Sequence, residues 1–127
     1  MPHFVIDCSQ DILEQKTPDE IMNRVYETAV SSGLFASNDI KVRVQPFQYF
    51  RLGDHKKNFL HVFGYIMEGR STEQKADLSK QINISLAGLL PYISFLSVTI
   101  SEFEIATYSN KALINPENIE KNRHFGL

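Results

Sequence analysis

The sequence contains a single cysteine, Cys8, among its 127 residues, and it has no tryptophan. One cysteine cannot form a disulfide within the chain, which fits a reducing compartment, and its simplest role is that of a small buried hydrophobic residue. No run of about 18 apolar residues is present, so we expect no membrane span. The start of the chain lacks the basic and apolar regions of a signal peptide. These absences predict a cytoplasmic protein that does not associate with membranes.

The chain also lacks an excess of positive charge, since its formal net charge is −2. A protein that binds nucleic acid normally carries a basic surface, so no nucleic-acid partner is expected. The four histidines and Cys8 do not follow the spacing of metal ligands. No glycine-rich phosphate loop and no low-complexity segment can be found. Composition therefore favours an ordinary globular protein, and we expect one domain over residues 1–127 with a single core.

The hydrophobic pattern predicts two β-α-β units followed by a polar tail. Alternating or continuous apolar segments predict four strands, over residues 2–8, 40–45, 59–67 and 95–105. Two capping-box sequences, Thr17-Pro18-Asp19-Glu20 and Ser71-Thr72-Glu73-Gln74, predict helix starts. Gly33 and Pro91 are expected to end these helices. Residues 9–16 are interpreted as a polar connection and residues 106–127 as a polar tail.

Two β-α-β units of this kind predict an α+β fold with one four-stranded sheet and both helices on one face. The strands of each unit should be parallel, because a crossover helix connects them. Strand 59–67 is largely apolar on both faces, although helices are available for only one. We therefore expect an oligomer to cover the other face, and we expect the tail to pack on a neighbouring subunit.

The position of Pro2 directly after Met1 suggests a specific chemical role. Because proline is small, processing is expected to remove Met1 and leave proline at the N-terminus. A proline nitrogen within the chain has no proton, whereas a terminal one is a secondary amine. A terminal amine titrates near pH 8, and burial lowers this value. Pro2 is therefore a candidate base for proton-transfer catalysis.

Several segments together resemble a known family. They are the Pro2-His3-Phe4 start, Gly33-Leu34-Phe35, residues 40–44, Glu68-Gly69-Arg70-Ser71 and Phe103-Glu104-Ile105. In these features the chain is similar to the 5-carboxymethyl-2-hydroxymuconate Δ-isomerases of the tautomerase superfamily, over nearly its whole length. The resemblance implies a duplicated β-α-β fold and a homotrimer with an active site at each subunit interface. It also implies that neither a metal nor an organic cofactor is needed.

The resemblance implies roles for four residues. Pro2 would carry the proton, and Arg70 would bind a substrate carboxylate. Arg43 matches a family arginine, whereas Lys41 stands where the family typically has arginine, and lysine lacks the planar fork that binds a carboxylate bidentately. The implied reaction is the tautomerisation of an acidic muconate, such as 5-carboxymethyl-2-hydroxymuconate, in the degradation of aromatic compounds through homoprotocatechuate.

Two alternatives remain open at this point. A relative could use the same amine for decarboxylation or for hydrolytic dehalogenation. The protein could instead be a trimeric binding protein without catalysis if Met1 is retained, because an acylated proline nitrogen has no proton to exchange. Lys41 and Arg43 are also compatible with a solvated strand face. Arg70 is expected to be exposed at the start of its helix, with little effect on stability.

Overall fold

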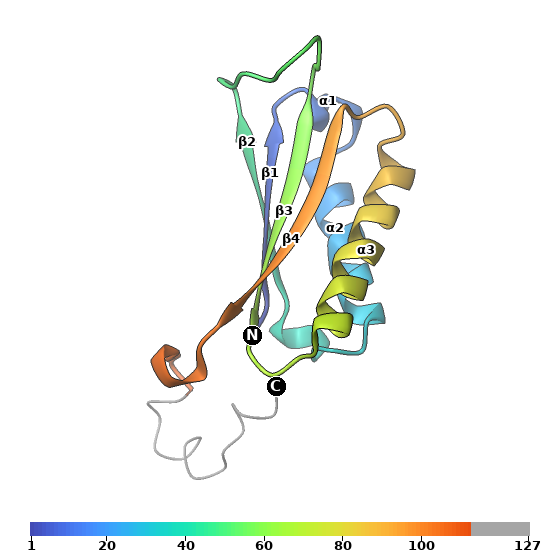
Figure 1. Ribbon diagram of the computed structural model, residues 1–127. Coiled ribbons are helices and arrows are strands. Elements are labelled where there is room, and N and C mark those ends of the chain that lie inside the picture. Colours follow the sequence, from blue (N-terminus) through green and yellow to red (C-terminus); the bar gives the residue numbers. More distant parts are fainter. Residues whose placement is uncertain (113–127) are drawn as a thin grey trace.

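Two long helices cover one face of a four-stranded sheet in the computed structural model, which describes residues 1–112 (Figure 1). The helices are α1 (Ile12–Gln15), α2 (Pro18–Ser31) and α3 (Thr72–Leu89). The strands are β1 (His3–Ser9), β2 (Lys41–Phe47), β3 (Phe59–Met67) and β4 (Phe95–Phe103). Short 3-10 turns, η1 (Ser37–Asp39) and η2 (Ile105–Thr107), precede β2 and follow β4.

The strands lie in the order β2-β1-β3-β4. β1 runs parallel to β2, β3 runs parallel to β4, and the two pairs meet through the antiparallel contact of β1 with β3. The starts of β1 and β2 therefore lie at the same end of the sheet as the ends of β3 and β4, at the bottom of Figure 1. This topology confirms the predicted α+β fold with two β-α-β units and both long helices on one face.

Local sequence signals fix the ends of the two long helices. The Thr17 hydroxyl accepts a hydrogen bond from the Glu20 amide (3.1 Å), and the Glu20 carboxylate accepts one from the Thr17 amide (2.9 Å). Ser71 and Gln74 form the same reciprocal pair before α3, at 3.1 and 2.8 Å. Gly33, with a φ of 73°, occupies the left-handed region after α2. Both predicted capping boxes and the predicted glycine stop are confirmed.

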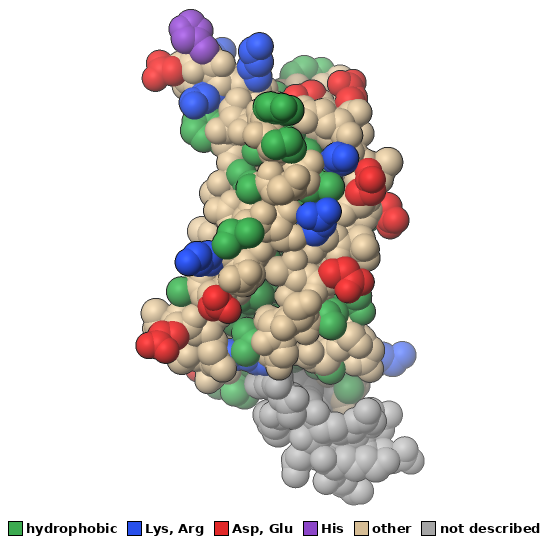
Figure 2. Space-filling model, turned by 90° about the vertical axis from the view of Figure 1, so that its right-hand side faces the viewer, with side chains coloured by type: hydrophobic (Ala, Val, Ile, Leu, Met, Phe, Trp, Pro, Cys, Tyr) green, Lys and Arg blue, Asp and Glu red, His purple; other side chains and the backbone are tan. Residues whose placement is uncertain are grey.

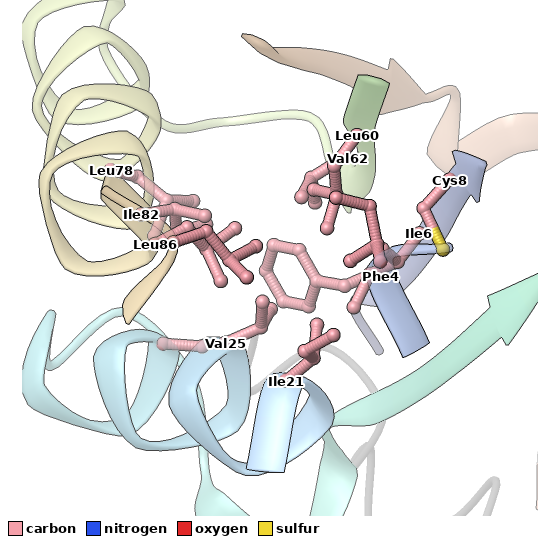
Figure 3. Close-up of a cluster of buried hydrophobic side chains, with 13 residues drawn as sticks. Phe4, Ile6, Cys8, Ile21, Val25, Leu60, Val62, Leu78, Ile82 and Leu86 are labelled. Atoms are coloured by element: carbon pink, nitrogen blue, oxygen red, sulfur yellow. The ribbon is translucent and has the colours of Figure 1, made fainter. Parts of the chain in front are cut away.

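The core lies between the helices and the covered face of the sheet, with Phe4 near its centre (Figure 3). Its ring faces Ile21 and Val25 from α2 and Ile82 and Leu86 from α3. All five side chains are fully buried. Burying a side chain of this size stabilises the fold by about 1.5–3 kcal/mol, so the packing of this face supplies much of the driving force for folding. Cys8 is buried in the same cluster, as predicted.

Two features differ from the sequence-based expectations. The segment interpreted as a polar connection contains α1, whose Ile12 is fully buried. Four residues are too few to show a helical period, which is why the pattern did not indicate this turn. The last strand ends at Phe103 rather than near Ile105, which begins η2. Most of the predicted tail, residues 113–127, lies outside the described residues, so its packing on another subunit stays a prediction.

The outer side of the helices has the mixed surface of a solvated face. Figure 2 shows acidic and basic side chains interspersed with hydrophobic ones on this side of the molecule. Within residues 1–112, no helix combines the length and the apolar character that crossing a bilayer requires. The opposite side of the sheet, which no helix covers, carries Lys41 and Arg43, whereas Pro2 and Arg70 lie at the end of the sheet where β1 begins.

Candidate functional site

Pro2 lies at the end of the sheet where β1 begins, and it is buried. Its carbonyl oxygen accepts a hydrogen bond from the Lys41 amide at 3.1 Å, which holds the start of β1 beside the start of β2. The amine of Met1 lies 4.0 Å from a carboxylate oxygen of Asp39. Burial lowers the pKa of this amine; Asp39 opposes the effect, and the positive charges of Lys41 and Arg70 add to it. An amine at this end of the chain is therefore biased towards its neutral form.

Arg70 lies in the turn between β3 and α3 and reaches the same end of the sheet. Its guanidinium donates to the Leu34 carbonyl oxygen at 2.5 Å and to the Met67 carbonyl oxygen at 3.5 Å. It also lies over the Phe35 ring, 5.1 Å from the centroid. The expectation that Arg70 is exposed is wrong, because these contacts leave it half-buried and burial lowers its pKa. Gly69, with a φ of 118°, makes the turn that directs the chain into α3.

Lys41 and Arg43 are exposed on the open face of β2, beside β1. The Lys41 ammonium donates to the Asp39 carbonyl oxygen at 2.6 Å. The Arg43 guanidinium approaches Nδ1 of His3 at 3.2 Å. The prediction that both cations share one strand face is confirmed. Arg43 also connects to β1 through His3, a contact that the strand pattern alone did not indicate.

An aromatic group lines the open face next to these cations. The Phe103 ring lies 6.3 Å from that of Tyr65, 5.9 Å from that of His3 and 5.7 Å from that of Tyr108, measured between centroids. Sequence reasoning assigned no role in the site to Phe103 or Tyr108. The strand order would have indicated Phe103, because the end of β4 meets the start of β1 only across an antiparallel β1–β3 pair.

The four predicted site residues therefore meet at one end of the molecule, although they come from β1, β2 and the turn before α3. A buried position for a terminal amine, three cations and an aromatic wall together suit an organic anion that exchanges a proton. Within residues 1–112, no three His, Cys, Asp or Glu side chains are grouped to bind a metal ion. A separate groove of about 530 Å³ lies between α2 and α3 and contains none of these residues.

The fold is that of the tautomerase superfamily, as solved structures show. A 5-carboxymethyl-2-hydroxymuconate isomerase from Deinococcus radiodurans R1 superposes with a TM-score of 0.75 and 23% identity, covering 87% of this chain and 88% of its own. A fused 4-OT, W0, solved as a symmetric trimer, superposes with a TM-score of 0.71 and 14% identity, covering 86% and 93%.

Sequence comparison gives the family itself. Residues 2–122 match the 5-carboxymethyl-2-hydroxymuconate isomerase family, and the chain belongs to that family. The 5-carboxymethyl-2-hydroxymuconate Δ-isomerase of Escherichia coli is 26% identical over 84 residues, which cover 65% of this chain and 67% of that protein. The resemblance inferred from the sequence is thereby confirmed, and the chain is an isomerase-family member of the tautomerase superfamily.

Proposed function

We propose that this protein is a cofactor-independent isomerase that tautomerises an acidic dienol such as 5-carboxymethyl-2-hydroxymuconate, with Pro2 as the proton carrier once Met1 has been removed. One observation supports this most directly. Pro2 is buried at the start of β1, and the Met1 amine attached to it lies within electrostatic reach of Lys41 and Arg70. A secondary amine in this place would be a base near neutral pH, as general base catalysis requires.

The reaction needs only one group that takes a proton and returns it. The neutral Pro2 amine accepts a proton from the substrate, and the conjugated system carries the electron pair that is left behind. The resulting ammonium donates the proton taken from the dienol hydroxyl to a carbon of the conjugated system, which restores the amine. A single positioned acid–base group typically contributes about 10²–10⁴-fold to the rate. Since the same amine acts in both halves, the mechanism consumes no cofactor.

The cations would hold the carboxylates of the substrate. Arg70 is anchored to the backbone by two donors of its guanidinium, and a guanidinium has five N–H donors in all. The remaining donors can therefore bind a carboxylate in a fixed orientation. Lys41 and Arg43 are exposed on β2, beside β1, and would bind a second carboxylate. Lysine at position 41 binds as a point charge rather than as a planar fork, so this end of the substrate is held with less directional preference.

The open face of the sheet supports a homotrimer. Its aromatic rings include a stacked pair, Phe63 and Tyr65, with centroids 6.4 Å apart. Phe47, Phe50 and Phe95 are also exposed large hydrophobic residues. Large exposed apolar side chains gathered on one face often mark an interface, and the fused 4-OT of the same fold is a trimer. We propose that three copies cover these faces and that each site lies at a subunit boundary.

An assay with a panel of dienol acids tests the function. We expect the protein to isomerise 5-carboxymethyl-2-hydroxymuconate, and to prefer a tricarboxylate over a dicarboxylate dienol of similar length. Lys41→Arg should sharpen that preference and lower KM. Release of carbon dioxide or halide from the corresponding acids, without isomerisation, would instead assign the amine to another reaction. Light scattering that shows a stable monomer at micromolar concentration would contradict the trimer.

A further inference from the structure

His3 follows Pro2 directly, and the structure restricts its protonation state. Its side chain lies on the open face, half-buried, with Lys41 and Tyr65 as its partners on the neighbouring strands. Nδ1 lies 3.2 Å from Nη1 of Arg43. A guanidinium has only hydrogen-bond donors and stays protonated, so Nδ1 must accept. An imidazole that accepts through Nδ1 is neutral and carries its hydrogen on Nε2.

The groups around His3 favour this same neutral form. Burial lowers its pKa, and the positive charges of Arg43, Lys41 and the N-terminal amine lower it further. The remaining neighbours with ionisable groups are Tyr65 on β3 and Tyr108 beyond β4, both grouped around the Phe103 ring. Phe103 packs edge-on against the imidazole, with an interplanar angle of 88°, and so helps to fix its orientation.

The hydrogen on Nε2 is available to a ligand. Arg43 is the only hydrogen-bond partner of the His3 ring among residues 1–112, and it occupies Nδ1. The ring thus presents one free donor, attached to the residue next to the candidate base. A neutral imidazole held in this way is suited to stabilise an oxygen on which negative charge develops, because it donates without carrying a charge of its own.

We propose that His3, through Nε2–H, donates a hydrogen bond to the substrate oxygen that becomes negative when Pro2 accepts a proton. This role rests on the proposed isomerase function. In the first half-reaction the O–H bond of the dienol breaks, an N–H bond forms on Pro2, and the electron pair of the broken bond stays on that oxygen. In the second half that pair forms a C=O bond, the double-bond electrons shift to a distal carbon, and this carbon takes the proton from Pro2 to form a new C–H bond, while the His3 hydrogen stays on Nε2. Arg43 is then also a positioning residue, because it fixes the tautomer of His3.

Kinetics of two His3 variants test the proposal, with His55→Gln as a matched control. His55 lies in the exposed loop between β2 and β3, at the other end of the sheet. His3→Phe keeps a ring but removes the donor, and we expect kcat to fall about 10²-fold, as for the loss of one donor to a developing oxyanion. KM should change less than about threefold, because the bond strengthens only in the transition state. His3→Gln retains a donor and should recover much of the lost kcat, and His55→Gln should match the wild type.

Nitrogen NMR of the imidazole provides a readout that does not depend on turnover. The wild-type His3 ring should show a bare Nδ1 and a protonated Nε2 at neutral pH, and Arg43→Gln should raise its pKa and mix the tautomers. Full kcat in His3→Phe, or a protonated Nδ1 in the wild type, would overturn the role of His3 while leaving the isomerase intact. A wild type that turns over no dienol acid would instead overturn the proposed function, and the role of His3 with it.

Discussion

In β1 and β3, every second residue points towards the helices and is buried, whereas the residues between them lie on the open face and are mostly half-exposed. Phe4 and Val62 contribute to the core on the covered side. His3, Phe63 and Tyr65 lie on the open side of the same strands, and His3 lies beside the cations of β2. Because side chains alternate along a strand, one short sequence can meet two separate demands. The covered set holds the fold together, and the open set is free for the association and chemistry that we propose.

Truncation of Phe4 should show most clearly that the two faces of the sheet contribute differently to stability. We expect Phe4→Ala to lower the free energy of unfolding by about 3–5 kcal/mol, because it leaves a cavity between both helices and the sheet. Val5→Ala, one residue further on the open face, should cost much less. Urea unfolding followed by circular dichroism measures both variants. Equal losses of unfolding free energy in the two variants would contradict the claim that the covered face stabilises the fold more than the open face does.

Arg70→Ala should affect the site more than the fold. Loss of a charged hydrogen bond to a carboxylate is worth about 1.5–3 kcal/mol, so we expect kcat/KM on the dienol acid to fall roughly 10–10²-fold. The variant also loses its bonds to the Leu34 and Met67 carbonyls, which should lower stability by about 1 kcal/mol. Arg51→Ala, in the exposed loop at the other end, is the control. Wild-type kcat/KM in Arg70→Ala would remove Arg70 from the site.

Gly64→Ala tests how tightly the covered face is filled. A Cβ at this position would lie 2.7 Å from Cδ1 of Ile100 and 3.0 Å from Cε1 of Phe4. Overpacking of this kind costs about 1–3 kcal/mol of stability. Gly53→Ala is a matched control, because a Cβ there would meet no atom within 4 Å. Thermal unfolding of the pair should show a loss for position 64 alone, and an unchanged Gly64→Ala protein would indicate that this part of the core is loosely packed.

The smallest expected effect is a pH dependence that originates on the open face. Burial lowers the pKa of His3 and of His61 from 6.5, so the unfolded chain binds more protons than the folded one just below that pH. The folded state therefore has its full stability above the unfolded pKa of these histidines. It loses part of that stability as the pH falls through their lower pKa values in the folded protein. Urea unfolding should therefore give a lower free energy at about pH 5.5 than at about pH 7.5. The slope should flatten in the His3→Gln, His61→Gln double variant, and an unchanged slope would exclude these two histidines as its source.

The elements that the sequence predicted well depend on neighbouring residues. The capping boxes at Thr17 and Ser71 operate within a single helical turn, and strand alternation assigns residues to faces without knowledge of the partner strands. Pro2 was identified from its position directly after Met1, and the segments around it also resemble a family, which the comparison then confirmed.

The features that were missed depend on residues far apart in the chain. The half-buried state of Arg70 comes from the carbonyl of Leu34 and the ring of Phe35, more than thirty positions away. The contact of His3 with Arg43 depends on the register between β1 and β2. The local pattern could place each of these side chains on a face but could not say which partner it would meet there.

Two forms of the protein that differ only before Pro2 provide the most direct test of the central claim. One has Met1 removed, as intact mass verifies, and the other has a glutamine inserted between Met1 and Pro2, so that the proline nitrogen is an amide. We expect the processed form to isomerise the dienol acid, with an ionisation at or below about pH 8 in its kcat/KM profile. The extended form should lose at least about 10²-fold in kcat/KM, because an amide nitrogen cannot accept a proton near neutral pH. Circular dichroism should show both forms folded, since an end residue makes few core contacts. Equal activity in the two forms would contradict Pro2 as the base.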